Sequence, residues 1–377
     1  MQDRAQHWLQ QILALPLEKP VRIMNVCGGH ERAIAMAGLR SLLPSAVQLI
    51  PGPGCPVCIC PEEDIHQAIQ WALDQRVIVA SFGDMLRVPV NGPRGEVNSL
   101  AAARAAGAEV HAIASPAEAV RIARENPERQ VVFHAVGFET TMAPIAAMII
   151  EGLPDNLLLL ASGRRTWPAV AMLLDSPDAG LDALIAPGHV ATVMGPEEWA
   201  FVHQRHRIPV AIAGFTADSL LAAIHAVLVQ WLEGKAPLTN CYVAAARPGG
   251  NPRARQLLAQ AFDVVDAPWR GIGVIAQSGY ALKPALAAHD ARHQLPLVTP
   301  AQPGKDLPPG CDCARVVLGK ISPPACRLYG TACRPASPIG PCMVSDEGAC
   351  RIWWTAGLHR RTPPDRASGA ANVEGHS

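Results

Sequence analysis

Eleven cysteines are the most informative residues of this 377-residue chain, and they are unevenly distributed. The N-terminal group is Cys27, Cys55, Cys58 and Cys60, the C-terminal group is Cys311, Cys313, Cys326, Cys333, Cys342 and Cys350, and Cys241 stands alone between them. The first residues carry early charges and no long apolar run, so we expect neither a secretory signal nor a structural disulfide framework. Two groups of cysteines indicate two chemical tasks, whereas Cys241 is expected to be a small buried apolar residue.

The sequence CGGH places the thiol of Cys27 and the imidazole of His30 three residues apart on a turn that glycine permits. A helix that begins after this turn would offer its N-terminus to the thiol and lower its pKa. The resulting thiolate is a soft ligand for Fe(II) or Cu(I), and it is also a nucleophile. The alternative is a glycine turn that carries Cys and His without using them, and we favour the functional interpretation.

The sequence CPVC places Cys55 and Cys58 in a loop stiffened by proline and glycine. Such a pair cycles between dithiol and disulfide, or supplies two metal ligands. Because one pair cannot complete a tetrahedral zinc site, a redox role is favoured over structural zinc. Cys60 adds a third sulfur two residues further on, which leaves the pairing open.

Two further polar segments also follow predicted strands. The sequence GFETT contributes an acid, Glu139, and two hydroxyls, Thr140 and Thr141, at the start of a helix. Either threonine would alternatively serve as the N-cap of that helix. The sequence PGH contributes His189, which is a candidate metal ligand or proton donor.

The C-terminal group includes four cysteines with gaps of six, eight and seven residues, namely Cys326, Cys333, Cys342 and Cys350. Four thiolates hold either a [4Fe–4S] cluster or one zinc ion. Zinc ribbons and fingers favour close pairs of cysteines, so these wider gaps favour iron–sulfur. Cys311 and Cys313 would substitute for one ligand or form a second thiol pair.

Short β-rich runs alternate with helical patterns, as in parallel sheets that are covered on both faces. Strands are predicted at 21–26, 47–50, 77–81 and 109–113 in a first unit, and at 130–136, 157–162, 183–186 and 209–213 in a second. Helices are predicted near 32–43, 62–75, 97–107, 140–152, 167–175, 195–205 and 216–232. The motifs above follow strand ends, where sites form in open α/β sheets. Asp84 and Arg87 also follow a strand, and we expect them to form a local ion pair.

These patterns predict an α/β protein with two similar parallel-sheet domains and a Cys-rich iron–sulfur domain. The first domain, 1–120, carries the CGGH and CPVC loops, and the second, 121–234, carries the GFETT and PGH loops. The pattern weakens after about residue 235, so the iron–sulfur domain is placed at 235–357 and a disordered tail at 358–377.

The composition excludes several classes of function. Lys+Arg and Asp+Glu both number 32, and aromatic residues make up 5%, so a nucleic-acid-binding role is disfavoured. No uninterrupted apolar run approaches the ~18 residues of a membrane helix. We therefore expect a cytoplasmic protein that binds neither nucleic acid nor membrane.

The order of the motifs resembles that of the HypD family, the iron–sulfur maturation factors of [NiFe]-hydrogenases. From about residue 5 to 355 they read CGGHERAI, GPGCPVCICP, SFGDMLRVP, VGFETT, APGHV, WRGIGVI and CRLYGTACRPASPIGPCMVSDEGAC. The resemblance implies two α/β domains and a cluster-bearing third domain. It implies that Cys27 binds iron, with His30 in the same motif, and that Cys55 and Cys58 are the redox-active pair. It further implies cleft residues Glu139, Thr140, Thr141 and His189 and [4Fe–4S] ligands Cys326, Cys333, Cys342 and Cys350.

The resemblance also implies a function. The protein would be a scaffold and redox protein that holds Fe(II) while CO and cyanide ligands are attached, so that the Fe(CN)2CO moiety of the [NiFe] site is assembled. A HypC-type chaperone would share the iron, a HypE-type partner would donate cyanide, and a hydrogenase large-subunit precursor would be reached through the chaperone. The rival interpretations are a stand-alone iron–sulfur thiol oxidoreductase or redox sensor, and a zinc-stabilised binding module.

The chain departs from the usual family pattern at several positions. Glu31 and Arg32 replace Thr and His of CGGHTHAI, and Cys60 replaces the Thr of CPVCVTP. Thr216 replaces an acid in the GFEPLD stretch. These departures indicate a divergent branch, but they remove no thiol that the implied chemistry needs.

Overall fold

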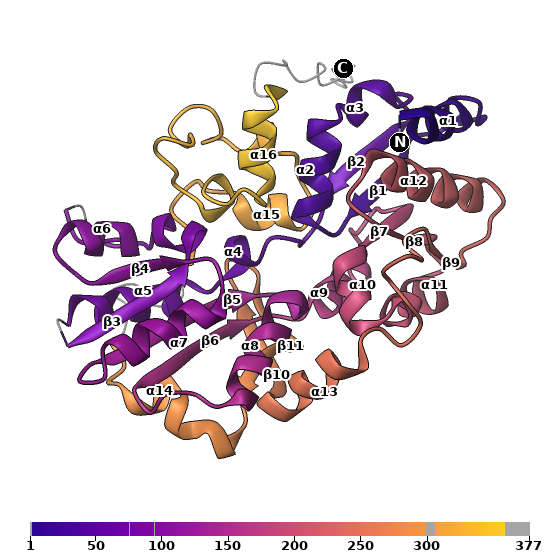
Figure 1. The fold of residues 1–377 in the computed structure, drawn as a ribbon. Coiled ribbons are helices and arrows are strands. Elements are labelled where there is room, and N and C mark those ends of the chain that lie inside the picture. The colour runs from indigo at the N-terminus through magenta and orange to yellow at the C-terminus, as the bar shows by residue number, and fades with distance from the viewer. Residues whose placement is uncertain (1, 75, 94, 299–305, 359–377) are drawn as a thin grey trace, which may run out of the picture.

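The computed structural model of this chain describes residues 2–74, 76–93, 95–298 and 306–358. Its strands form two parallel sheets and one antiparallel hairpin (Figure 1). Sheet A has the order β2 (Val47–Pro51), β1 (Val21–Asn25), β7 (Ala183–Pro187), β8 (Val210–Ala213) and β9 (Leu238–Asn240). Sheet B has the order β4 (Val110–Ile113), β3 (Val77–Phe82), β5 (Gln130–Gly137) and β6 (Leu157–Gly163). The predicted fold class, α/β with two parallel sheets and a Cys-rich region, is confirmed.

The strands are grouped differently from the two consecutive units that the sequence predicted. Ile23 of β1 pairs with Ala183 of β7, so the first two strands belong to the sheet that the later strands complete. The predicted boundary near residue 120 falls within α7 (Pro116–Glu125), which connects two strands of sheet B. The division into 1–120 and 121–234 is therefore wrong as a description of the sheets. Apolar runs identify strands, but they do not identify the neighbour of each strand.

Helices cover both faces of each sheet, which explains why strands such as β6 and β7 are buried along their whole length. The faces of sheet A are covered by α1 (Gln2–Leu13), α2 (Gly28–Met36), α3 (Leu39–Leu42) and α12 (Ala217–Leu232) on one side, and by α9 (Thr166–Leu174), α10 (Gly188–Met194) and α11 (Ala200–His206) on the other. The faces of sheet B are covered by α7, α8 (Glu139–Glu151) and α13 (Pro252–Ala261) on one side, and by α5 (Glu62–Leu73) and α6 (Leu100–Ala105) on the other. Within the described ranges, no helix has the length and apolar character that a membrane span requires.

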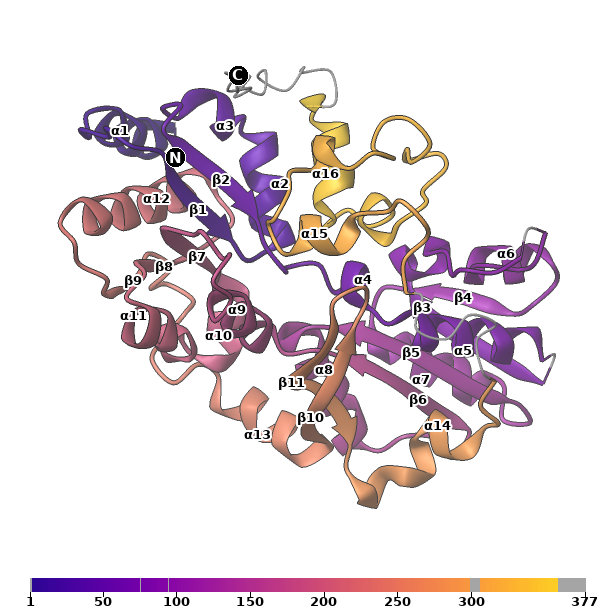
Figure 2. The ribbon, with the colours of Figure 1, turned by 180° about the vertical axis from the view of Figure 1, so that it is seen from behind.

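An antiparallel hairpin follows the two sheets, and the sequence patterns did not predict it. Its strands are β10 (Phe262–Trp269) and β11 (Gly273–Leu282), and Figure 2 shows it reaching towards α4 (Pro56–Ile59). At its turn, the backbone N–H of Arg270 donates to the carbonyl of Ile59 at 3.0 Å. The guanidinium of Arg270 is fully buried and pairs with Glu62 at 2.7 Å. The hairpin therefore supports the helix that carries the CPVC motif.

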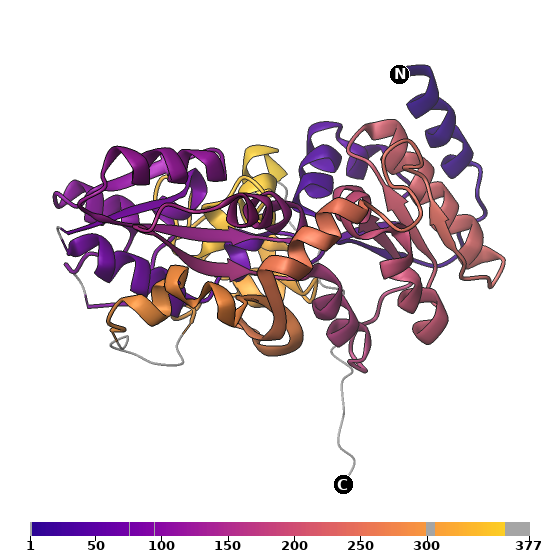
Figure 3. The ribbon, with the colours of Figure 1, turned by 60° about the horizontal axis from the view of Figure 1, so that its bottom comes forward.

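The Cys-rich segment, residues 311–355, has little regular structure and lies between the two sheets (Figures 1 and 3). The short helices of the C-terminal part are α14 (Ala291–Gln294), α15 (Cys313–Val317) and α16 (Ala349–Thr355). The buried residues of this segment join the apolar core on one face of sheet B, and α16 packs against α2 beside sheet A. The segment thus connects the loops at the ends of both sheets. The predicted tail, apart from residue 358, lies outside the described residues.

Candidate functional site

The CGGH motif forms the turn between β1 and α2. Cys27 is the residue before α2, and its side chain is buried. The backbone N–H of Gly28 donates to the carbonyl of Gly54 at 3.1 Å. A Cβ atom at Gly54 would lie 2.3 Å from the Cα of Cys27, so only glycine allows this approach. The CGGH turn therefore packs directly against the loop that carries the CPVC motif.

The imidazole beside the Cys27 thiol comes from His189, at the start of α10, and not from the CGGH motif itself. The Nδ1 atom of His189 is 3.8 Å from Cys27 Sγ. The Nε2–H of His30 instead donates to the carbonyl of Ala213 at 3.0 Å. The ring of Phe215 lies 5.0 Å from each of the two imidazoles. Burial lowers the pKa of His30 to about 3 and that of His189 to about 4, so both rings are neutral at pH 7.

The Cys27 thiol is less acidic than the sequence predicted. Burial, followed by the charge of the nearby Glu347 carboxylate, raises its pKa to about 12. The backbone N–H groups at the start of α2 act in the opposite direction, but burial outweighs them. The expected lowering of the pKa is therefore wrong for this state. Cys27 is therefore a protonated thiol at neutral pH.

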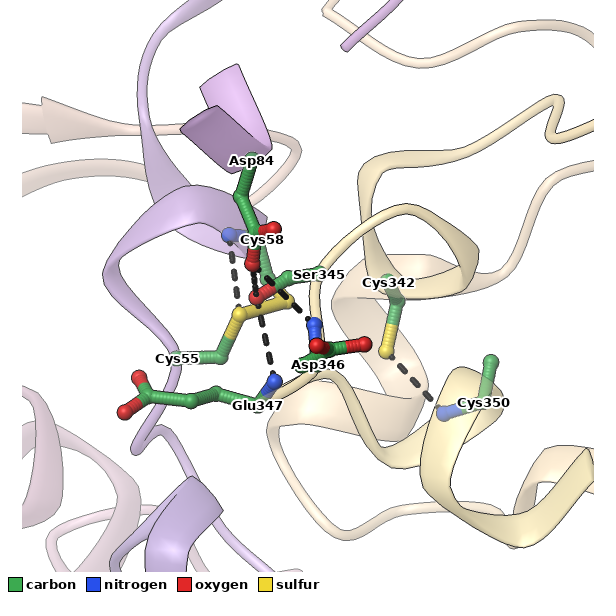
Figure 4. Close-up of a disulfide and its surroundings, with 8 residues drawn as sticks. All are labelled: Cys55, Cys58, Asp84, Cys342, Ser345, Asp346, Glu347 and Cys350. Atoms are coloured by element: carbon green, nitrogen blue, oxygen red, sulfur yellow. Dashed lines mark hydrogen bonds between the residues drawn. A yellow bond between two sulfur atoms is a disulfide. The ribbon is translucent and has the colours of Figure 1, made fainter. Parts of the chain in front are cut away.

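The CPVC cysteines form a disulfide, Cys55–Cys58, at the start of α4 (Figure 4). The backbone N–H of Cys58 donates to Cys55 Sγ at 3.2 Å. Cys60 does not share in this pairing, because its Sγ atom lies 3.8 Å from Nε2 of His134 in β5. Burial raises the pKa of Cys60 to about 12. The sequence left the pairing open, and the structure pairs Cys55 with Cys58. Cys60 is instead buried in the core on one face of sheet B.

A small cavity brings the thiol groups together. Its lining includes Cys27, both disulfide cysteines, Cys342 of the Cys-rich segment and the carboxylate-bearing Glu347. Glu347 also closes the cavity from the side of the Cys-rich segment, because a Cβ at Gly28 would lie 2.5 Å from its carbonyl oxygen. Burial raises the pKa of Glu347 to about 7. Sequence reasoning missed this residue, since an acid within VSDEGAC carries no pattern that distinguishes it from a surface acid.

Asp84 and Arg87 do not form the local ion pair that the sequence predicted. Asp84 accepts hydrogen bonds from Ser345 Oγ at 3.0 Å and from the backbone N–H of Asp346 at 3.1 Å (Figure 4). Arg87 donates to the carbonyl of Val344 at 3.3 Å. Both side chains follow β3 and hold the turn before Glu347, so they position the Cys-rich segment against sheet B.

Six cysteines converge in the Cys-rich segment, rather than the four that the spacing singled out. All of them lie in or against one buried core, and they are Cys311, Cys313, Cys326, Cys333, Cys342 and Cys350. The thiols of Cys313 and Cys342 interact with each other, and each also interacts with one further cysteine of the group. A Cβ at Gly340 would lie 2.5 Å and 2.6 Å from the sulfurs of Cys311 and Cys313. Because Gly340 has no side chain, the sulfurs of Cys311 and Cys313 can occupy this space.

The donor set of the Cys-rich segment suits an iron–sulfur cluster. The sulfur of Cys333 accepts a hydrogen bond from the backbone N–H of Ile339 at 3.3 Å, and the sulfur of Cys342 accepts one from Cys350 at 3.4 Å. Backbone N–H groups of this kind stabilise thiolate sulfur. Among the described residues, no group of three or more His, Cys, Asp or Glu side chains is spaced to hold a single metal ion. The six buried or half-buried thiols exceed the four ligands that a [4Fe–4S] cluster takes.

The GFETT residues do not line the cavity that contains the Cys27 thiol. Both carboxylate oxygens of Glu139 accept hydrogen bonds from Thr166, from its backbone N–H at 2.6 Å and from its hydroxyl at 2.7 Å. Neither threonine of the motif caps the helix, because α8 begins at Glu139 and its N-cap is Phe138. Thr141 instead packs against Gly137, where a Cβ would lie 2.3 Å from the Cβ of the threonine. Thr140 is half-buried on the same turn.

A second buried acid, Glu198, lies near Glu139, and this pair makes a testable contribution to stability. Burial, followed by the charge of Glu139, raises the pKa of Glu198 to about 8. Since this value lies above the ordinary 4.5, folding binds a proton between these pH values, and the associated stability is lost as the pH rises through about 8. Because of this group, the free energy of unfolding of the wild type should fall by on the order of 3 kcal/mol between pH 5 and pH 9. In Glu198→Gln this fall should be absent. Urea titrations at several pH values measure this slope.

Glu125→Gln is the matched control, because Glu125 is an exposed acid in a helical ion pair with Arg121. It should leave the pH dependence of unfolding unchanged. An unaltered slope in Glu198→Gln would contradict the assignment.

The fold and the site define an α/β protein of two parallel sheets, in which a buried thiol, a disulfide and a cysteine cluster meet where the sheets and the Cys-rich segment join. The chain belongs to the HypD family, because the family model described as the hydrogenase formation hypA family matches residues 3–357. It is 39% identical to hydrogenase maturation factor HypD2 of Bradyrhizobium diazoefficiens, over 93% of each chain. It is 39% identical to HypD of Azotobacter vinelandii, over 91% of each chain, and 38% identical to HypD of Escherichia coli, over 94% of this chain and 92% of that one.

Proposed function

We propose that this chain acts in hydrogenase maturation as a scaffold that holds iron while the Fe(CN)2CO moiety of a [NiFe] site is assembled. Its family supports the maturation role, since the curated relatives are named for it. The observation that carries the proposal is the shared cavity, in which the Cys27 thiol lies beside the Cys55–Cys58 disulfide. A metal-binding thiol and a redox pair in one cavity suit an assembly that consumes electrons.

Cys27 is the proposed ligand of the iron that is carried as cargo. Its thiolate is a soft donor, and the proton that the metal displaces leaves to solvent, since the neutral ring of His189, 3.8 Å away, has a pKa of only about 4. Since no group of three donors is spaced for one ion among the described residues, the chain leaves most coordination positions of this iron open. Open positions are what CO, two cyanides and a ligand from a second protein require. A HypC-type chaperone is the proposed source of that further ligand.

The Cys55–Cys58 pair is the proposed store of reducing equivalents, which it holds in its reduced, dithiol form. Reduction of the disulfide takes up two electrons and two protons and yields the thiols of Cys55 and Cys58, and its re-formation returns them. Glu347 lines the same cavity, and its pKa of about 7 suits a group that exchanges protons with these sulfurs. Once the pair has been reduced, the chain therefore holds two electrons and a proton-exchanging acid in one cavity.

Cys326, Cys333, Cys342 and Cys350 are the proposed ligands of a [4Fe–4S] cluster, with Cys311 and Cys313 as the remaining thiols of the group. When bound, the cluster would supply electrons singly. Cys342 lines the cavity that also contains the disulfide, so the two groups of sulfurs adjoin. This contact is also the observation that favours the rival function, a stand-alone thiol oxidoreductase.

Infrared spectroscopy separates the two functions. The full chain is isolated anaerobically together with a HypC-type chaperone, in cells that contain a HypE-type cyanide donor and a hydrogenase large-subunit precursor. The scaffold function predicts absorption in the CO and cyanide stretching region from iron held by the complex. A complex that contains iron–sulfur and redox-active thiols but lacks these bands is the result expected of the oxidoreductase.

Cys333→Ala is expected to lose most of the iron–sulfur absorption and most of the bound iron. Its sulfur is buried and accepts a backbone hydrogen bond, so alanine cannot replace it as a ligand. Because cluster binding is coupled to folding, the variant should also melt at a lower temperature. Iron analysis and visible absorption of the anaerobic protein measure the loss, with Cys241→Ala as the control. A colourless, folded wild type that contains zinc would contradict the cluster assignment.

A further inference from the structure

A buried carboxylate joins the CGGH helix to the last helix of the Cys-rich segment. Glu31 of α2 is 1% exposed, and its Oε1 atom accepts a hydrogen bond from the indole N–H of Trp353 at 2.6 Å. Its Oε2 atom accepts hydrogen bonds from Asn25 at 3.0 Å and from Arg40 at 2.8 Å. Asn25 ends β1 and Arg40 lies on α3, whereas Trp353 belongs to α16. One side chain therefore connects the element that carries Cys27 to the segment that carries the cysteine cluster.

Arg40 strengthens this connection from a second direction. Its guanidinium lies 4.9 Å from the centroid of the Trp353 ring, in a cation–π contact. The indole is thus held at its single polar atom by Glu31 and on its face by Arg40. Both contacts come from the sheet A side, so they determine how α16 lies against α2.

The position of α16 determines how the thiol cavity is closed. Cys350 lies on α16, and the turn just before it carries Glu347 and follows Cys342. Glu31 and Glu347 line the same cavity as Cys27. The backbone of Glu347 leaves no space for even a Cβ at Gly28, so α2 and this turn are in direct van der Waals contact. Movement of α16 away from α2 would open this contact.

We propose that Glu31 is a positioning residue, which holds α16 against α2 through Trp353 and thereby keeps the Cys-rich segment closed over the Cys27 thiol. This inference deepens the proposed function and rests on it for its consequence, the close approach of the two groups of sulfurs. The contact has its own test, because closure of the cavity is measurable without any bound metal.

The test follows alkylation of Cys27 by iodoacetamide in the full-length protein under anaerobic conditions, measured by mass spectrometry. Trp353→Phe keeps the ring over Arg40 but loses the N–H that Glu31 accepts. We expect Cys27 to be labelled about tenfold faster in this variant, as loss of a hydrogen bond to a charged group would allow. Glu31→Gln should accelerate labelling at least as much. The double variant should match the faster single variant, because both changes remove one shared interaction.

Two controls separate opening of the cavity from general unfolding. Trp354→Phe makes the same chemical change one residue further on, where the ring packs edge-on against Tyr329, and it should label at the wild-type rate. Cys241, on the sheet A side, reports general unfolding, and its labelling rate should be equal in all variants. Since Glu31→Gln leaves the largely buried Arg40 without its carboxylate, Trp353→Phe is the milder variant if stability falls.

The results separate this inference from the function on which it rests. Labelling of Cys27 at the wild-type rate in both Trp353→Phe and Glu31→Gln would overturn the positioning role and leave the scaffold function standing. Absence of CO and cyanide bands from the wild-type complex would overturn the scaffold function. Faster labelling of the two variants would support the positioning role even then.

Discussion

Cys27→Ser is expected to abolish the CO and cyanide infrared bands of the complex with the chaperone while leaving the iron–sulfur absorption in place. Serine has nearly the shape of cysteine, so the turn between β1 and α2 and its contact with Gly54 should survive. A hard hydroxyl oxygen does not replace a soft thiolate on iron that carries strong-field ligands. The expected result is a folded protein without its cargo, and the bands should fall to background.

Three further variants test this result. Cys241→Ser removes a half-buried thiol elsewhere on sheet A and should retain the bands at full intensity. His189→Ala should reduce the bands without abolishing them, because it removes the imidazole beside the thiol and not the thiol itself. His30→Ala should also cause a partial loss, through its bond to Ala213. If Cys27→Ser shows bands of wild-type intensity, Cys27 is not the iron ligand and the proposal fails.

Cys55→Ser is expected to abolish hydrogenase maturation while retaining the iron–sulfur absorption. One serine removes the disulfide, and with it the reversible uptake of two electrons. Thiol titration should therefore detect a two-electron couple in the wild type that is absent from the variant. Cys58→Ser should behave in the same way. Hydrogenase activity in a strain that expresses each variant measures maturation.

Cys60→Ser is the matched control for the redox pair. Cys60 lies two residues from Cys58, but its sulfur contacts His134 in the interior beneath sheet B. It should therefore neither replace Cys58 in the single variants nor contribute to the couple. Full maturation by Cys55→Ser would contradict the redox role.

Most strands of the two sheets were predictable because they are continuous apolar runs, but the short and only half-buried strand β9 was not predicted. The first five residues of β6, 157–161, are buried throughout, and such a run is readily recognised between helical patterns. The pairing of β1 with β7 was not predictable, because pairing depends on contacts far apart in the chain. The hairpin of β10 and β11 was missed for another reason, since its strands alternate between buried and exposed residues and contain glycine and proline.

The thiols of the site were predictable from residue type, but their surroundings were not. CGGH and CPVC identify Cys27 and the disulfide, and strand ends predicted that their loops would meet. No local pattern indicates that His189 supplies the neighbouring imidazole or that Glu347 closes the cavity, because both approach from other parts of the fold. The pKa of Cys27 was mispredicted for the same reason, since burial is a property of the whole fold.

Because β1 pairs with β7, sheet A cannot be completed until a much later part of the chain has been synthesised. A ribosome that has made Cys27, Cys55 and Cys58 has not yet made the strands that complete sheet A, since Ile23 pairs with Ala183. At ~5–20 residues per second, these thiols emerge on the order of ten seconds before β7 is available to shelter them. The Cys-rich segment that covers them is made later still. A nascent chain therefore has these sulfurs before it has the cavity that they line.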